Sequence, residues 1–260
     1  MIYGEWKKLG LLLSSYKTKP IDIKEIKMSE NSKSKMGSRY RCLLATELEQ
    51  GKTRRLLEEI CHPLPVKVTA DDDYFPQGFS DSKELILTSQ RAKHFFEKHF
   101  PDPGFDHVKL MLKDKWWLTP KKGGNTPNWD IVSSCELSNG SKALIIVEAK
   151  AHKSELDSAG KTLTTVATED SSANHRSIEK AINKANAGLN AAYSPKGFSI
   201  SIKRCYQLSN RFAFAWKLAS LKIPVVLMYL GFVNAKEMGD YFHDDKDWAE
   251  NLLEHSNGII

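Results

Sequence analysis

The sequence has no long hydrophobic run. No stretch of its 260 residues approaches the ~20 consecutive apolar residues that a membrane-spanning helix needs. The longest apolar run near the start, from Leu9 to Leu13, is too short for the core of a signal peptide. We therefore expect no membrane association and a cytoplasmic location.

Cysteine is scarce. The chain has four cysteines, which are widely spread and form no CxxC pair: Cys42, Cys61, Cys135 and Cys205. A zinc ribbon or a disulfide framework is therefore not expected. The sequence also lacks a Gly-x-Ser-x-Gly nucleophile motif, a dinucleotide-binding fingerprint and a complete phosphate-binding loop. Several common enzyme classes are thereby excluded.

The net charge of +6 comes from one end of the chain. Residues 1–41 hold ten Lys or Arg against four Asp or Glu, whereas residues 42–260 hold 28 of each sign. Residues 29–38 are small, polar and charged, which is typical of a linker. We expect residues 1–38 to be a basic N-terminal arm and linker outside the catalytic core, with Met36 as an alternative start. Such an arm can bind phosphates or simply be solvated.

The hydrophobic pattern of residues 39–260 predicts one α/β domain with a mixed sheet. Residues 39–60 have apolar positions at helical spacing, with a break at Gly51 as one alternative. The acidic triplet Asp71-Asp72-Asp73 indicates a solvated turn. The remaining elements are predicted as a helix over 82–100, strands over 107–118, 128–137 and 142–150, helices over 174–192 and 206–220, a buried strand over 223–233 and a short last helix around 248–253. Residues 151–173 are expected to be a loop. The short C-terminus shows no clear final element, which fits a chain that is part of a longer protein.

A charge cluster follows the most apolar predicted strand. Glu148 and Lys150 share one face of that strand because strand side chains alternate. The turn at Asn139-Gly140 decides where Asp130 lies on the neighbouring strand. A strict two-residue loop places Asp130 on the opposite face, whereas an odd loop or a glycine bulge at Gly140 places it beside Glu148.

Two carboxylates that converge at a strand end repel each other unless a cation joins them. Carboxylate oxygens suit Mg²⁺ or Mn²⁺, and such a cation can polarise a phosphate and activate a bound water. Lys150 on the same face can then orient that water. The alternative is a structural ion pair between Glu148 and Lys150 at the end of the strand.

The motif Pro127-Asn128-Trp129-Asp130, followed after seventeen residues by Glu148-Ala149-Lys150, resembles the PD-(D/E)XK nuclease superfamily. The proline that usually precedes the aspartate is replaced by Trp129. With Val147 to His152, Tyr206-Gln207 and Asn210-Arg211, the chain is similar to a bacterial branch of that superfamily. The resemblance implies a restriction endonuclease-like core over about 82–233 in a single domain of residues 39–260, with an N-terminal helical extension.

The resemblance also implies roles for individual residues. Asp130, Glu148 and the backbone carbonyl of Ala149 would bind Mg²⁺ or Mn²⁺, and Lys150 would position the attacking water. Many members add a carboxylate from the first core helix, for which Glu84 and Glu97 are the candidates. Gln207 and Arg211, four residues apart on one helix face, are candidates for holding a phosphate.

Three hypotheses follow. The first is a metal-dependent phosphodiesterase, a DNA nuclease, which the intact Asp130, Glu148 and Lys150 favour. The second is a catalytically silent nuclease-like fold used for nucleic-acid binding or assembly, which the neutral charge of residues 42–260 favours. The third is a purely structural α/β protein. Many relatives form homodimers, but the sequence carries no diagnostic interface.

Overall fold

A computed structural model describes residues 11–14, 36–119, 124–163, 167–192 and 197–260 of the chain. Within these ranges no helix combines the length and the apolar character needed to cross a lipid bilayer. The helices are α1 (Gly37–Thr46), α2 (Gln50–Ile60), α3 (Ala92–His99), α4 (Phe105–Lys109), the π-helix η3 (Leu110–Trp117), the short 3-10 helices η4 (Lys153–Glu155) and η5 (Lys236–Met238), α5 (Glu169–Ala192), α6 (Tyr206–Ser220) and α7 (Asp245–Ser256). The strands are β1 (Leu11–Ser14), β2 (Val66–Lys67), β3 (Tyr74–Phe75), β4 (Leu85–Ile86), β5 (Asn128–Trp129), β6 (Ile131–Leu137), β7 (Lys142–Lys150) and β8 (Val225–Gly231).

The architecture is α/β around one mixed sheet, in agreement with the predicted fold class. The strand order is β1-β8-β7-β6-β2, and β3 also pairs with β6. The pairs β7–β8 and β1–β8 are parallel, whereas β6–β7 is antiparallel. The strand predicted over 223–233 corresponds to β8, which is buried throughout as expected for a strand covered on both faces.

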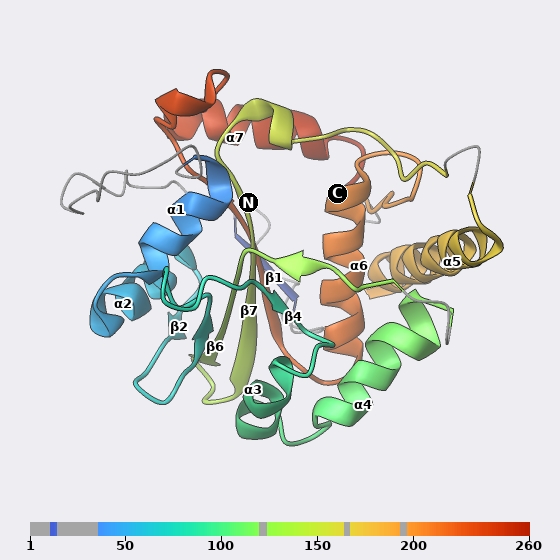
Figure 1. Ribbon diagram of the computed structural model, residues 1–260, viewed down its shortest axis with the longest axis horizontal. Coiled ribbons are helices and arrows are strands. Elements are labelled where there is room, and N and C mark those ends of the chain that lie inside the picture. Colours follow the sequence, from blue (N-terminus) through green and yellow to red (C-terminus); the bar gives the residue numbers. More distant parts are fainter. Residues whose placement is uncertain (1–10, 15–35, 120–123, 164–166, 193–196) are drawn as a thin grey trace.

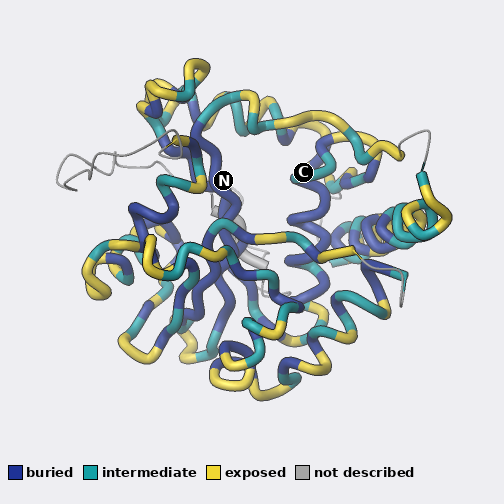
Figure 2. The backbone as a smooth tube through the Cα atoms, in the orientation of Figure 1, coloured by how far each residue is buried: buried dark blue, intermediate teal, exposed yellow. Residues whose placement is uncertain are grey.

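Helices cover both faces of the sheet (Figure 1). Alternate residues of β7 point to opposite sides, so Leu144 and Ile146 join the core beneath α6, while Ile145 and Val147 join the core beneath α1 and α2. In Figure 2 the central strands and the inner surfaces of these helices are dark blue, and the exposed segments lie at the periphery. Glu148 and Lys150 have the same parity as Ile146 and therefore face α6.

The β6–β7 hairpin has a loop with an odd number of residues, one of the two alternatives that the sequence left open. Leu137 donates its N–H to the Ser141 carbonyl at 2.9 Å, so residues 138–140 form a three-residue loop. Gly140 occupies the left-handed region at φ 79°, where glycine is favoured. Ile131 then pairs with Val147, and one step further this register places Asp130 opposite Glu148. The alternative with a strict two-residue loop is wrong.

The strand predicted over 107–118 is wrong, because this segment forms α4 and the π-helix η3. The alternation of Val108, Leu110 and Leu112 suggested a strand. However, Val108, Leu112 and Trp116 are also four residues apart, and these three are buried while Leu110 is 40% exposed. Burial in this segment therefore follows the period of a helix and not that of a strand. Both Trp116 and Trp117 are buried, with ring centroids 5.1 and 4.6 Å from that of Phe214.

Several predicted elements differ in extent. The helix predicted over 82–100 begins only at Ala92, since Leu85–Ile86 forms strand β4 against β5. The segment 39–60 forms two helices that break between Thr46 and Gln50, so Gly51 lies inside α2. The strand predicted over 128–137 is interrupted at Asp130, because Asn128–Trp129 pairs with β4 in a separate two-stranded sheet while Ile131–Leu137 forms β6. Helix α5 begins at Glu169, inside the loop predicted over 151–173. The remaining predicted elements are present, and α6 has the predicted bounds.

Part of the predicted N-terminal arm extends the sheet. Leu11–Ser14 pairs in parallel with Val225–Met228 of β8. The expected boundary at residue 38 is therefore wrong for these four residues. The other residues of the arm up to residue 35 lie outside the described residues, as do residues 120–123.

Asp72 is not in a solvated turn. Its side chain is fully buried and accepts hydrogen bonds from the Ser134 hydroxyl at 2.7 Å, Lys142 Nζ at 2.9 Å and the Thr69 N–H at 2.8 Å. Burial by itself raises the pKa of this carboxyl, but the hydrogen bonds from Lys142, Thr69 and Ser134 lower it below its usual value. Asp72 thus connects the loop before β3 to both strands of the hairpin.

We expect Asp72→Ala to lower the free energy of unfolding by about 3–5 kcal/mol, because it leaves Lys142 and two hydroxyls without their acceptor. Urea unfolding at pH 7 measures this change. Asp71→Ala is the matched control, since Asp71 is exposed and its replacement should change stability by less than about 0.5 kcal/mol. Equal effects of the two substitutions would contradict this account of the loop.

Candidate active site

The candidate site lies where β7 emerges from the apolar core. The side chains of Leu144 and Ile146 precede Glu148 and Lys150 on the same face of the strand. Glu148 is 3% exposed and Lys150 is 4% exposed, and Lys150 Nζ donates to Glu148 Oε1 at 2.7 Å. Two charged side chains this deeply buried are costly unless each has partners.

Helix α6 supplies those partners. Gln207 and Arg211 lie one turn apart, as their spacing predicts, and both face the end of β7. Lys150 Nζ donates to Gln207 Oε1 at 2.6 Å, and Arg211 Nε donates to Glu148 Oε2 at 2.6 Å. Arg211 also donates to Asn210 Oδ1 at 2.9 Å. Four of the residues predicted from the sequence therefore form one buried hydrogen-bonded group.

Asp130 lies between β5 and β6, at the edge where the β6–β7 ladder ends. Its Oδ2 accepts the Ala149 N–H at 2.7 Å, and its own N–H donates to the Val147 carbonyl at 3.1 Å. The N–H and carbonyl of one strand residue point to the same side, so the Ala149 carbonyl is also directed toward Asp130. Burial, and then the charge of Glu148, raise the pKa of Asp130 to about 7. The two carboxylates thus share one electrostatic environment.

The group balances its own charges. Lys150 and Arg211 both pair with Glu148, and Asp130 is bonded instead to the Ala149 N–H. Within the described residues no group of three or more His, Cys, Asp or Glu side chains is placed to hold a metal ion. The donor set that fits Mg²⁺ or Mn²⁺ consists of two carboxylates and the Ala149 carbonyl, all hard oxygen ligands. To ligate such an ion, Glu148 would have to exchange its bond to Lys150 or Arg211.

Glu84, rather than Glu97, is the additional carboxylate near the site. Leu85 of β4 pairs with Trp129 of β5, and extending this register by one residue brings Glu84 opposite Asp130. The charge of Glu84 also contributes to the raised pKa of Asp130. Glu84 precedes strand β4 and is not on a helix. Glu97 lies on α3 with 53% of its side chain exposed, and it pairs with Lys93 at 3.6 Å.

The sequence reasoning missed three residues around this group. The indole of Trp129 stacks against Arg211, whose Cζ lies 4.7 Å from the ring centroid. Tyr229 of β8 pairs in register with Glu148. His255 of α7 is close enough that the charge of Lys150, after burial, lowers the pKa of its imidazole. The signal for Tyr229 was present, since its hydroxyl interrupts an otherwise almost wholly apolar strand.

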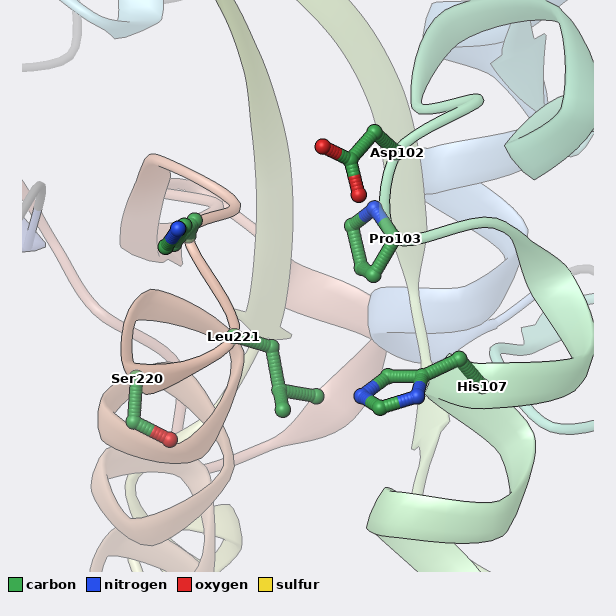
Figure 3. A pocket seen from close by; sticks show the side chains of 6 residues that line it. Asp102, Pro103, His107, Ser220 and Leu221 are labelled. Carbon is green, nitrogen blue, oxygen red and sulfur yellow. The ribbon is translucent and has the colours of Figure 1, made fainter.

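A surface pocket of about 320 Å³ lies elsewhere (Figure 3). It is lined by residues of the connection before α4, of α4 itself, and of the end of α6 and the turn that follows it: Asp102, Pro103, His107, Ser220, Leu221 and Lys222. These residues lie at the C-terminal end of α6, whereas Gln207 is in its first turn, about 20 Å away at ~1.5 Å per residue. The pocket is therefore not part of the candidate site.

Comparison of the chain with protein-family models, with curated proteins and with solved structures gives no match in any of the three. The interpretation of the site therefore depends on its geometry and on the resemblance of its sequence motifs.

The raised pKa of Asp130 makes a prediction about stability. Between pH 4 and about 7 the folded protein holds a proton on Asp130 that the unfolded chain has lost, so metal-free stability falls as pH rises through this range. We expect Asp130→Asn to raise the melting temperature at pH 8 by at least about 2–4 °C, equivalent to ~1 kcal/mol, and to have little effect at pH 4. Differential scanning calorimetry in EDTA measures both values.

Asp72→Asn is the matched control for Asp130→Asn. The lowered pKa of Asp72 gives the opposite sign: its ionised form stabilises the fold above about pH 4, and this stabilisation is lost on acidification. Asp72→Asn should therefore destabilise at pH 8. A destabilising effect of Asp130→Asn at pH 8 would refute the electrostatic account of the site.

Proposed function

We propose that this protein is a metal-dependent phosphodiesterase, a DNA nuclease of the PD-(D/E)XK superfamily, which hydrolyses phosphodiester bonds with an activated water. The observation that carries the proposal is the register of the hairpin. Its last pair, Ile131 with Val147, brings Asp130 within hydrogen-bond distance of the Ala149 N–H, while Lys150 and Arg211 both bond to Glu148 and Lys150 bonds to Gln207. The order of β6, β7, α6 and β8 is compatible with a restriction endonuclease-like core.

The residues divide into ligands and orienting groups. Asp130, Glu148 and the Ala149 carbonyl would hold Mg²⁺ or Mn²⁺. When bound, the ion polarises the phosphate and lowers the pKa of a bound water. Lys150, held by Glu148 and Gln207, would orient that water and offset charge that develops on the phosphate.

Arg211 would change partners when the site is loaded. In the structure its guanidinium neutralises Glu148 at 2.6 Å. Once Glu148 ligates a cation, that neutralisation is no longer needed, and the guanidinium can hold a phosphate oxygen instead. Guanidinium groups bind phosphate well because their donors match its geometry.

The proposed partner is the DNA backbone, because the groups of the site would bind a phosphate and not a base. Residues 42–260 carry no net charge. Any long-range electrostatic attraction to DNA would therefore come from the basic residues before Cys42. A homodimer is compatible with this proposal, as is a monomer.

The second candidate is a catalytically silent nuclease-like fold that binds nucleic acid or serves in assembly. The observation that favours it is that both oxygens of Glu148 already accept hydrogen bonds from cationic groups. In that case the four charged residues form a structural cluster. The two candidates differ in whether the protein takes up a divalent cation.

We expect the purified protein to cleave linear DNA with Mg²⁺ or Mn²⁺ and to lose this activity in EDTA. Asp130→Asn should abolish both Mn²⁺ binding, measured by isothermal titration calorimetry, and cleavage, because a two-carboxylate site cannot spare a ligand. The variant is suitable because it should be at least as stable as the wild type. Glu148→Ala is less suitable, since it leaves two buried cations without a partner. Absence of both Mn²⁺ binding and cleavage in the wild type would support the silent fold.

Lys150→Met tests the orienting role. This variant should keep Mn²⁺ binding, because Lys150 is not a ligand, while the cleavage rate falls by roughly a hundredfold or more. Lys246→Met is the control, since Lys246 is an exposed residue of α7 whose replacement should leave the rate unchanged. Circular dichroism establishes that both variants are folded at the assay temperature. A Lys150→Met variant with the wild-type rate would remove Lys150 from the mechanism.

A further inference from the structure

Tyr229 carries a buried hydroxyl without a partner. It lies on β8, is 7% exposed, and its hydroxyl is one of five buried side-chain polar atoms in the described residues that make no hydrogen bond. Leaving a buried hydroxyl unpaired costs about 1–3 kcal/mol. A phenylalanine would fill the same space in the strand without that cost, so the hydroxyl calls for an explanation.

The register of the sheet places this hydroxyl at the candidate site. Tyr229 is the direct neighbour of Glu148 in the parallel β7–β8 pair, and the two side chains point to the same face, toward α6. After burial, the charges of Glu148 and Asp130 raise the pKa of Tyr229, and that of Arg211 opposes them. The hydroxyl is therefore within electrostatic reach of both proposed ligands.

The wall of the site beside Tyr229 is closed to bulk water. Gly231, two residues on, is the neighbour of Lys150, and a Cβ atom there would lie 2.2 Å from the Trp248 ring. Trp248 of α7 thus packs directly on the strand. Bulk solvent cannot satisfy the Tyr229 hydroxyl from that side, which leaves the polar groups on the α6 side of the sheet as the place to look for its partner. A water is retained in such a place when two to four polar groups surround it.

The polar groups needed for such a water are present. Oδ2 of Asp130 accepts the Ala149 N–H, and each oxygen of Glu148 accepts one hydrogen bond from a cation and retains a second lone pair. The phenol can donate one hydrogen bond and accept another. We propose that Tyr229 is a further catalytic residue, whose hydroxyl binds a water molecule shared with Glu148 and with the divalent cation of the site.

This inference rests on the proposed function and assigns Tyr229 a task that differs from that of Lys150. Lys150 is already held by Glu148 and Gln207, so its donors are largely committed. The Tyr229 hydroxyl has no such commitment and is fixed by a central strand, which leaves little rotational freedom. It would hold the water in one orientation without the need to break an existing bond.

Tyr229→Phe removes only the hydroxyl and is the decisive variant. In EDTA its urea midpoint should equal or exceed that of the wild type, because an unpaired group is removed. Its Mn²⁺ affinity, measured by calorimetry, should fall about 3- to 10-fold, and kcat for DNA cleavage should fall about 10- to 100-fold with KM for DNA nearly unchanged. Tyr74→Phe is the matched control, since Tyr74 is a buried strand tyrosine in the core on the other face of the sheet.

Each outcome decides between the proposals. If the wild type binds Mn²⁺ and cleaves DNA but Tyr229→Phe matches it in affinity and kcat, the role of Tyr229 is wrong while the proposed function stands. Loss of cooperative unfolding in Tyr229→Phe would also overturn the inference, since the hydroxyl would then be structural. If the wild type neither binds Mn²⁺ nor cleaves DNA, both proposals fail together. A crystal structure of Lys150→Met with Mn²⁺ should contain a water within hydrogen-bond distance of the Tyr229 hydroxyl, and the lack of that water would refute its role.

Discussion

The arrangement of the candidate site depends on one carboxylate, that of Glu148. It is buried, and each of its oxygens accepts a hydrogen bond from a different cation, Lys150 from its own strand and Arg211 from α6. An ionised carboxylate in such a place is tolerated only because these charges neutralise it. The contact with Arg211 also fixes the rotation of α6, because Arg211 can reach Glu148 only if its helix face is turned toward β7.

From this constraint the rest of the site follows. With α6 fixed, Gln207 lies one turn away and accepts from Lys150. Asn210 is positioned to accept from Arg211, and Trp129 stacks against the same guanidinium. Asp130 alone stands outside this hydrogen-bonded group. Its pKa is raised first by burial and then by the charge of Glu148, and it makes no ion pair with a cation in the described part of the chain.

The elements nearest the site were the easiest to predict from sequence. Three segments fit a single secondary-structure period, that of a strand or that of a helix. They are the apolar run before Glu148, residues 206–220 with their helical spacing, and the almost wholly apolar segment after Ile223. The segment 107–118 fits two periods, and its helical state was decided by packing against Phe214, a residue about a hundred positions away. Local pattern cannot contain that information.

Individual contacts were less predictable than elements. The shared helix face of Gln207 and Arg211 could be read from their spacing, but their partners on β7 lie 57 and 63 residues earlier. Asp72 was misjudged for the same reason, because Ser134 and Lys142 are 62 and 70 residues away. The hairpin register left two alternatives open, and the left-handed Gly140 decided between them. Tyr229 was overlooked because a tyrosine in an apolar strand is usually a core residue.

The three-residue turn between β6 and β7 has a consequence for how this chain can vary in length. Side chains alternate between the two faces of a strand. Adding or removing one residue at 138–140 would shift the β6–β7 register by one residue, and Asp130 would then lie on the opposite face from Glu148, beneath α1. A change of two residues would restore the original face. The turn is exposed, yet whether its residue count is odd or even matters for a carboxylate at the far end of the hairpin. Natural variants that keep Asp130 beside Glu148 should therefore differ at this turn by even numbers of residues.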